Sequence, residues 1–259
     1  MRKLVIVFVS LLALVASIAP TAASSSAFKP SDAPRIKVKQ GTSTNWSGYA
    51  VETNLASPQK DAVSDVSGSW VVPSLQCGSA NSYSSIWVGI DGYSDNTVEQ
   101  TGTEQDCVNG QASYSAWFEM YPRFPVTLPA SSYPVAPGDT ISAEVRYSGK
   151  NQFLLTLTNS RNGSTLWSYS TTQKAKAQRE SAEWIVEAPW SRGVLPLADF
   201  GTVQFSGASA TLNGTSGTIS NKAWQNDPIT MVTSSGTVKA QPSSLSNGGS
   251  GFSVTWYHN

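Results

Sequence analysis

The stretch best suited to chemistry is a strand, a polar turn and a second strand. Ser85–Gly92 has the pattern of the first strand and Thr97–Gly102 that of the second, which brings Trp87, Asp91 and Gln100 into one neighbourhood. The primary amide of Gln100 can donate a hydrogen bond to an oxygen that gains negative charge during a reaction, as amides do in oxyanion holes. The stretch therefore offers a stabilising amide but no base.

The stretch Ser181–Glu187 offers the missing base. Alternation along a strand places Glu183 and Glu187 on one face, while Trp184 and Val186 point to the opposite face, towards a core. An ionised carboxylate can take a proton from water and later hand it to a leaving group, so it can promote attack of water on a carbonyl. Paired carboxylates can equally hydrolyse a glycosidic bond, and composition does not choose between these reactions.

Other reaction classes lack the residues that they need. The chain has one histidine, His258, close to its C-terminal end, which argues against Ser-His-Asp and Cys-His sites. Its two cysteines, Cys77 and Cys107, do not complete a tetrahedral zinc site with His258. No glycine-rich phosphate loop stands between a strand and a helix. We therefore expect neither a metal nor a cofactor.

The N-terminal residues indicate export. A basic start, an apolar run and small residues make residues 1–23 a predicted secretory signal peptide. The apolar run is too short for a membrane span, so we expect a secreted protein that leaves the membrane once the signal is removed. In an exported protein, Cys77 and Cys107 are expected to form a disulfide.

Residues 24–44 predict a basic pro-segment or flexible leader ahead of a body at 45–259. Four basic residues against one aspartate give the leader a net charge of +3, whereas 11 Lys/Arg against 16 Asp/Glu give the body −5. An acidic body argues against nucleic acid as a partner. The opposite charges predict that the leader inhibits by lying over the site until acid neutralises the carboxylates.

The body has the pattern of a single all-β domain. Short β-prone runs recur between Gly, Asn, Asp and Pro, which is typical of a sandwich or barrel. Gln152–Asn159 and Thr165–Thr171, joined through Asn162–Gly163, predict a hairpin. Lys174–Ser181 is the best candidate for a helical or irregular connection.

Four motifs in order resemble the glutamic peptidase (eqolisin) family, over roughly residues 45–257. They are Trp87–Gly92, Gln100–Gly102, Tyr114–Pro122 and Ala182–Glu187, and Asn45–Gly48 and Pro137–Asp139 also fit. Two positions depart from the family pattern, because Glu104 and Ser115 stand where aspartate is common.

The resemblance implies a β-sandwich of two antiparallel, curved, about seven-stranded sheets, of the concanavalin A-like or jelly-roll type. It also implies an endopeptidase that hydrolyses polypeptides at acid pH and is unaffected by pepstatin. The family's catalytic Gln–Glu dyad falls on Gln100 and Glu187. We expect the protein to be a monomer.

The family's supporting positions match four residues: Trp87, Asp91, Trp117 and Glu119. Trp87 and Trp117 could also fill a core, which is the usual place of tryptophan. Asp91 and Glu119 are expected to orient Gln100 or Glu187 by hydrogen bonds. Glu183 is the competing base, because it shares a face with Glu187.

In the expected mechanism, ionised Glu187 takes a proton from a water that attacks the scissile carbonyl, and then protonates the leaving amine. Gln100 stabilises the oxyanion. An unperturbed glutamate titrates near pH ~4.3, which is compatible with an acid optimum. The main alternative is a carbohydrate-binding or glycoside-hydrolysing β-sandwich protein that uses Glu183 and Glu187. A purely structural exported domain is a third reading.

Overall fold

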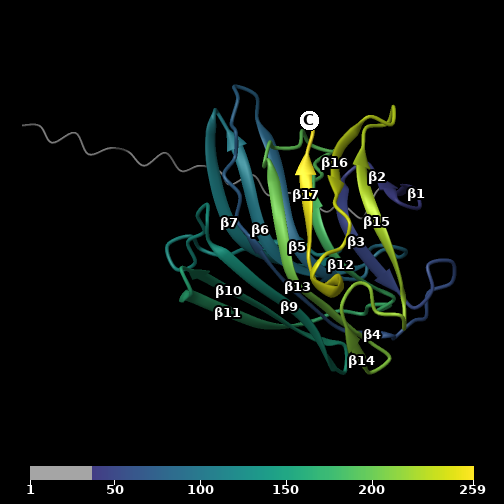
Figure 1. Ribbon diagram of the computed structural model, residues 1–259. Coiled ribbons are helices and arrows are strands. Elements are labelled where there is room, and N and C mark those ends of the chain that lie inside the picture. The colour runs from purple at the N-terminus through teal and green to yellow at the C-terminus, as the bar shows by residue number, and fades with distance from the viewer. Residues whose placement is uncertain (1–36) are drawn as a thin grey trace, which may run out of the picture.

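The computed structural model describes residues 37–259, and strands dominate that range (Figure 1). Its helical structure is a single 3-10 turn, η1 (Asn247–Gly249). The strands are β1 (Lys37–Lys39), β2 (Thr42–Ser43), β3 (Trp46–Glu52), β4 (Val63–Val71), β5 (Ser82–Ile90), β6 (Val98–Val108), β7 (Gln111–Tyr121), β8 (Val126–Thr127), β9 (Thr140–Gly149), β10 (Gln152–Arg161), β11 (Ser164–Lys174), β12 (Ser181–Glu187), β13 (Thr202–Leu212), β14 (Thr215–Gly217), β15 (Gln225–Val232), β16 (Val238–Pro242) and β17 (Phe252–Trp256).

These strands form two curved layers (Figure 1). Layer 1 has the order β15-β3-β12-β5-β6-β7-β8. Layer 2 has the order β11-β10-β9-β4-β13-β17-β16. β15 also pairs with β16, so the hydrogen-bonded network passes from one layer to the other along that side. Neighbouring strands in both layers are antiparallel, whereas β2 joins β15 in parallel.

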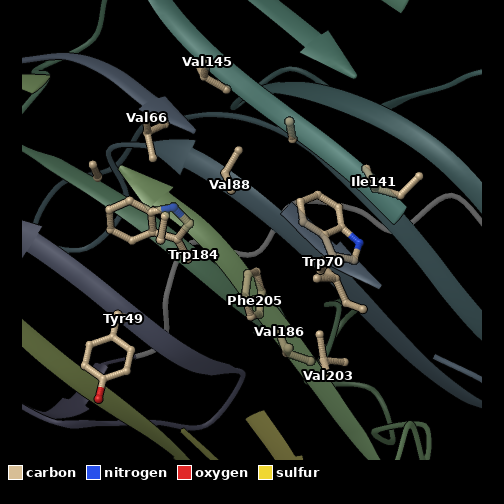
Figure 2. Packing of buried hydrophobic residues seen from close by; sticks show 14 of the residues in the cluster. Tyr49, Val66, Trp70, Val88, Ile141, Val145, Trp184, Val186, Val203 and Phe205 are labelled. Carbon is tan, nitrogen blue, oxygen red and sulfur yellow. The ribbon is translucent and has the colours of Figure 1, made fainter. Parts of the chain in front are cut away.

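The main core fills the space between the two layers. Trp184 enters it from layer 1, and Trp70 and Phe205 enter it from layer 2 (Figure 2). Trp70 Nε1 donates to Thr103 Oγ1 at 3.0 Å, and Trp184 Nε1 donates to the Ser67 carbonyl at 2.7 Å. These two indole N–H groups thus each find an acceptor in the opposite layer, which removes the cost of burying them unpaired.

β12 lies near the middle of layer 1, between β3 and β5, and all of its residues are buried. Trp184 faces the core, whereas Ile185 points the other way into a second apolar cluster with Trp87. By alternation, Glu183 and Glu187 share the face of Ile185. We call this face of layer 1, turned away from layer 2, the site face. Its carboxyl groups lie among large apolar side chains.

The expected sandwich of two seven-stranded sheets is confirmed, with β1, β2 and β14 as short additions. The hairpin expected around Asn162–Gly163 is β10 and β11. Lys174–Ser181 is an irregular connection without a helix, since β11 ends at Lys174 and β12 begins at Ser181.

The predicted signal peptide, residues 1–23, lies outside the described residues, as does the first part of the predicted leader. The last part of that leader, residues 37–44, contains β1 and β2 and pairs with the body through β15. In the described range no helix is long and apolar enough to cross a bilayer.

Cys77 and Cys107 form the expected disulfide. Cys107 lies near the end of β6, opposite Ser82 at the start of β5, and Cys77 lies in the loop before β5. The two cysteines are 30 residues apart in the sequence. Their bond ties the open end of the β5–β6 hairpin, opposite its turn, to the segment that leads into β5.

Replacing both cysteines by serine, Cys77→Ser with Cys107→Ser, is expected to lower the free energy of unfolding by about 2–4 kcal/mol, because the unfolded chain gains freedom. Denaturant unfolding followed by tryptophan fluorescence measures this change. The folded variant should keep the specific activity of the wild type, since the bond lies at the far end of β6 from Gln100. A variant as stable as the wild type would contradict the loop-closure argument.

Candidate active site

Four neighbouring strands, β12, β5, β6 and β7, bring most of the predicted residues onto the site face. Their register produces three rows of facing residues. The rows are Glu187, Ser85, Glu104 and Ser115; then Ile185, Trp87, Gly102 and Trp117; then Glu183, Gly89, Gln100 and Glu119.

Glu187 receives an N–H donor on each carboxylate oxygen. Trp87 Nε1 donates to Oε2 at 2.9 Å, and Asn45 Nδ2 donates to Oε1 at 3.2 Å. Trp46 packs edge-on against Trp87, with 4.8 Å between the ring centroids. Donors on both oxygens fix the plane of the carboxylate and favour its ionised form. Trp87 therefore orients Glu187 in addition to filling space.

Gln100 is held by its neighbour on β7. Its Nε2 donates to Glu119 Oε2 at 2.5 Å, and both side chains are buried. A carboxylate accepts but does not donate, so this contact decides which end of the amide faces Glu119. The second N–H of Nε2 is then able to meet an oxygen of a substrate. The contact gives Glu119 the geometry of an orienting residue.

Trp87 separates the two halves of the site. Gly89 leaves room for its ring, because a methyl group there would lie 3.0 Å from Trp87 Cζ3 and 3.1 Å from Gln100 Cβ. The pyrrole edge of the same indole is hydrogen-bonded to Glu187. On β6, a side chain at Gly102 would lie only 2.6 Å from Trp87 Cβ. Gln100 and Glu187 therefore flank one indole, and two glycines are needed to seat it.

Trp117 lies one strand beyond Gly102, in the same apolar cluster as Trp87. Its Nε1 is buried and makes no hydrogen bond. Buried indole N–H groups usually have an acceptor, so an unpaired one at the site face is a candidate donor to a carbonyl of a bound chain.

Asp91 does not lie where we expected it. Its carboxylate accepts the backbone N–H groups of Arg179 and Glu180, both at 2.7 Å, rather than orienting Gln100 or Glu187. Asp91 follows β5 with a φ of 73°, so the face alternation of the strand no longer applies to it. It anchors the irregular segment that leads into β12.

Glu183, the competing base, lies in the row of Gln100 but in different surroundings. It is fully buried, and burial together with neighbouring carboxyl groups raises its pKa well above the usual range. Those neighbours are Asp91, Asp95 and Glu52. A carboxyl group placed there keeps its proton and makes a poor base, whereas Glu187 has two N–H donors for its charge.

Burial also raises the pKa of Glu187, to about 8, although the hydrogen bonds from Trp87 and Asn45 lower it. The unperturbed value near ~4.3 that we assumed from the sequence is therefore wrong for the folded protein. The pKa of Glu104, in the same row, is raised by burial and by nearby carboxyl groups that include Glu187. The sequence around Glu187 does not show how deeply the end of β12 is buried.

Sequence reasoning missed the role of Asn45. It entered only as part of a motif, yet its side chain contacts Glu187, which lies 142 residues later in the chain. The antiparallel pairing of β3 with β12, with Trp46 opposite Glu187, creates this contact. No local pattern signals a contact at such a separation.

Two other features bear on ligands. Among residues 37–259, no group of His, Cys, Asp or Glu has the geometry to hold a metal ion. A groove of about 290 Å³ lies on layer 2, and its lining includes Ser69, Ser142, Glu144, Thr156 and Thr158. None of the dyad or supporting residues lines this groove.

Comparison with known proteins agrees with this geometry. The model of the peptidase A4 family matches residues 44–256. This chain belongs to the peptidase A4 family. It is 31% identical to aspergillopepsin-2 of Aspergillus niger over 194 residues, which cover 66% of each protein and thus just under two thirds of that relative.

Solved structures lead to the same family. The crystal structure of scytalido-glutamic peptidase with a peptide-based transition-state analogue has a TM-score of 0.65 and 25% identity, covering 83% of this chain and 98% of that one. Aspergilloglutamic peptidase from Aspergillus niger has a TM-score of 0.56 and 30% identity, covering 68% and 99%. The resemblance to glutamic peptidases is confirmed, and the chain is a glutamic-type peptidase by family.

The buried carboxyl groups predict that stability falls as pH rises. Six of them have raised pKa values: Asp91, Glu99, Glu104, Glu180, Glu183 and Glu187. Above pH ~4 the unfolded chain has lost these protons while the folded chain keeps them, so each group makes the free energy of unfolding fall as the pH rises. This stabilisation is complete below about pH 4, and the Glu187 share is lost by about pH 8.

Thermal unfolding between pH 3 and pH 8 tests this expectation. We expect the midpoint temperature to fall steadily above about pH 4. The variant Glu99→Gln, which replaces one such group by a neutral isostere, should show a shallower slope. An equal midpoint temperature at pH 4 and pH 7 would contradict the expectation.

Proposed function

We propose that this protein is a secreted endopeptidase that hydrolyses peptide bonds on the acid side of neutrality, with Glu187 as general base and Gln100 as oxyanion stabiliser. One observation carries the proposal. A carboxylate with an N–H donor on each oxygen and an amide held by a second carboxylate flank the same indole. Membership of the peptidase A4 family supports the reaction class.

The proposal gives each group one step. Ionised Glu187 takes a proton from a water that attacks the scissile carbonyl. The free N–H of Gln100 Nε2 donates to the oxyanion of the tetrahedral intermediate. Glu187 then gives its proton to the leaving amine, a step that its raised pKa favours because the acid form is well populated below pH 8.

Peptide substrates are supported by the relatives. The scytalido-glutamic peptidase structure contains a peptide-based transition-state analogue, and a related structure contains the tripeptide Ala-Ile-His. On the site face, the unpaired Nε1 of Trp117 offers a further donor for a peptide carbonyl. We propose that pepstatin does not inhibit, because the proposed dyad consists of one carboxyl group and one amide rather than two carboxyl groups.

Secretion and inhibition by the leader complete the proposal. The signal-peptide pattern of residues 1–23 supports export. The +3 charge of residues 24–44 opposite the −5 body supports an inhibitory contact at neutral pH. Since residues 37–44 are paired with the body, the inhibitory part would be residues 24–36, which hold Lys29 and Arg35 against Asp32, a net charge of +1.

The rival carbohydrate function has less support. The layer 2 groove has hydroxyl side chains and one carboxyl group, but its lining includes no aromatic ring on which a sugar could stack. Glu183 is too deeply buried to form a glycosidase pair with Glu187.

Three single variants test the dyad on a denatured protein substrate such as casein at acid pH. Gln100→Ala should lower the rate by about 10²–10³, the typical cost of one lost oxyanion donor. Glu187→Gln should lower it by about 10²–10⁴ through loss of the base. Glu183→Gln is the matched control and should keep most of the activity. Full activity of either of the first two variants, with circular dichroism showing a native fold, would refute the assignment.

The pH dependence of kcat/KM tests the state of Glu187. Because the ionised fraction of a base increases tenfold per pH unit below its pKa, log(kcat/KM) should rise with a slope of about one on the acid side. The rise should continue past pH ~4.3 and then reverse as the fold loses stability. Initial rates from short incubations between pH 2 and pH 7 measure it. A plateau that begins near pH 4 would show that Glu187 is not perturbed.

A further inference from the structure

Ser43 is a fully buried hydroxyl next to the site that the proposed mechanism does not use. It accepts the backbone N–H of Asn45 at 3.2 Å and that of Trp46 at 3.1 Å. It also donates to Asn45 Oδ1 at 3.0 Å. This last bond decides how the amide of Asn45 is turned, because only Oδ1 can accept from the hydroxyl.

Asn45, oriented in this way, makes two hydrogen bonds at the end of β12. Its side-chain Nδ2 donates to Glu187 Oε1 at 3.2 Å. Its backbone carbonyl accepts the backbone N–H of Ala188, the residue after β12, at 2.8 Å. Asn45 is 0% exposed, so neither bond competes with solvent. The residue holds both the side chain of Glu187 and the backbone just after it.

We propose that Ser43 and Asn45 form a positioning pair that sets the orientation and the charge state of the Glu187 carboxylate. This inference rests on the proposed role of Glu187 as the base. Trp87 on β5 holds one carboxylate oxygen and Asn45, in the bend between β2 and β3, holds the other, so two donors fix the plane of the group. The hydrogen bond from Asn45 also lowers the pKa of Glu187 against the effect of burial.

The pair depends on the segment before β3. β2 carries Ser43 and runs parallel to β15, with Thr42 opposite Thr230 and Ser43 opposite Met231. Gly41 strengthens the attachment, because its N–H donates to Asp227 Oδ2 at 2.9 Å and its carbonyl accepts the Thr230 N–H at 2.9 Å. The end of the segment that the sequence presents as a removable leader is thus part of the site. Any activating cleavage must fall before Ser43.

Full-length variants test the pair. Asn45→Ala removes the donor and should lower kcat about 10- to 100-fold with little change in KM, because a hydrogen bond to a charged group is lost. It should also move the acid limb of the pH profile upward by about one to two units, since the ionised form of Glu187 is less favoured. Ser43→Ala should shift the profile in the same direction by less, and Ser43→Thr, which keeps the hydroxyl, should restore it.

Asn159→Ala is the matched control. Asn159 is equally buried, and its Nδ2 also donates to a carboxylate, Asp139 Oδ2 at 2.8 Å, but it lies on β10 in layer 2. We expect it to lower the thermal midpoint without moving the acid limb. If Asn45→Ala lowers the midpoint in the same way and leaves the limb in place, its role is only structural and the proposal is wrong. If Asn45→Ala does not fold, equal limbs for Ser43→Ala and Ser43→Thr overturn it instead.

Failure of the positioning pair can be distinguished from failure of the proposed dyad. If Glu187→Gln retains activity, Glu187 is not the base. If Glu187→Gln is inactive but Asn45→Ala leaves the acid limb of the pH profile in place, only the positioning pair is wrong. N-terminal sequencing of the active protein after export gives an independent reading. We expect its first residue to be Ser43 or an earlier one, and an active form that starts after Ser43 would overturn the inference.

Discussion

Burial of carboxyl groups is the constraint on which the rest of this structure depends. The described ion pairs of Asp61, Asp139 and Glu144 do not include Glu104, Glu183 or Glu187, which are buried on the site face. A carboxyl group taken out of water in this way is far cheaper to bury with its proton than without it. The fold is therefore suited to acid, and the same property limits how much ionised base is present at low pH. Stability and catalysis oppose each other along the pH axis.

β12 shows how one strand can give two carboxyl groups different chemistry. Glu183 and Glu187 share a face and are four residues apart, yet Glu187 receives N–H donors from Trp87 on β5 and from Asn45 just before β3. Glu183 lies beside other carboxyl groups, so burial and repulsion both favour its protonated form. Different surroundings, rather than different residue types, separate a candidate base from a buried acid.

The sequence predicted the features that depend on alternation and motif order. Alternation placed Trp184 towards the core and Glu187 away from it, the Asn162–Gly163 turn signal gave the β10–β11 hairpin, and two cysteines in a chain with an export signal gave the Cys77–Cys107 bond. The failures have a common cause. The carboxylate of Asp91 accepts a hydrogen bond from Arg179, 88 residues later, and β2 pairs with β15, whose position in the chain gives no local signal. The pKa of Glu187 likewise depends on layers that assemble around it.

The indole of Trp87 makes the site a single unit. Because a side chain at Gly89 or Gly102 would collide with Trp87, the two glycines allow the ring to be held closely, and its N–H donates to Glu187. A rigid aromatic ring restrains the Glu187 carboxylate more firmly than a flexible side chain could. Asn45, which donates to Glu187, and Glu119, which accepts from Gln100, act at the outer ends of this arrangement, where each restrains one member of the dyad. The precision of the site therefore comes from β5, β7 and the bend before β3, while the reacting groups lie on β6 and β12.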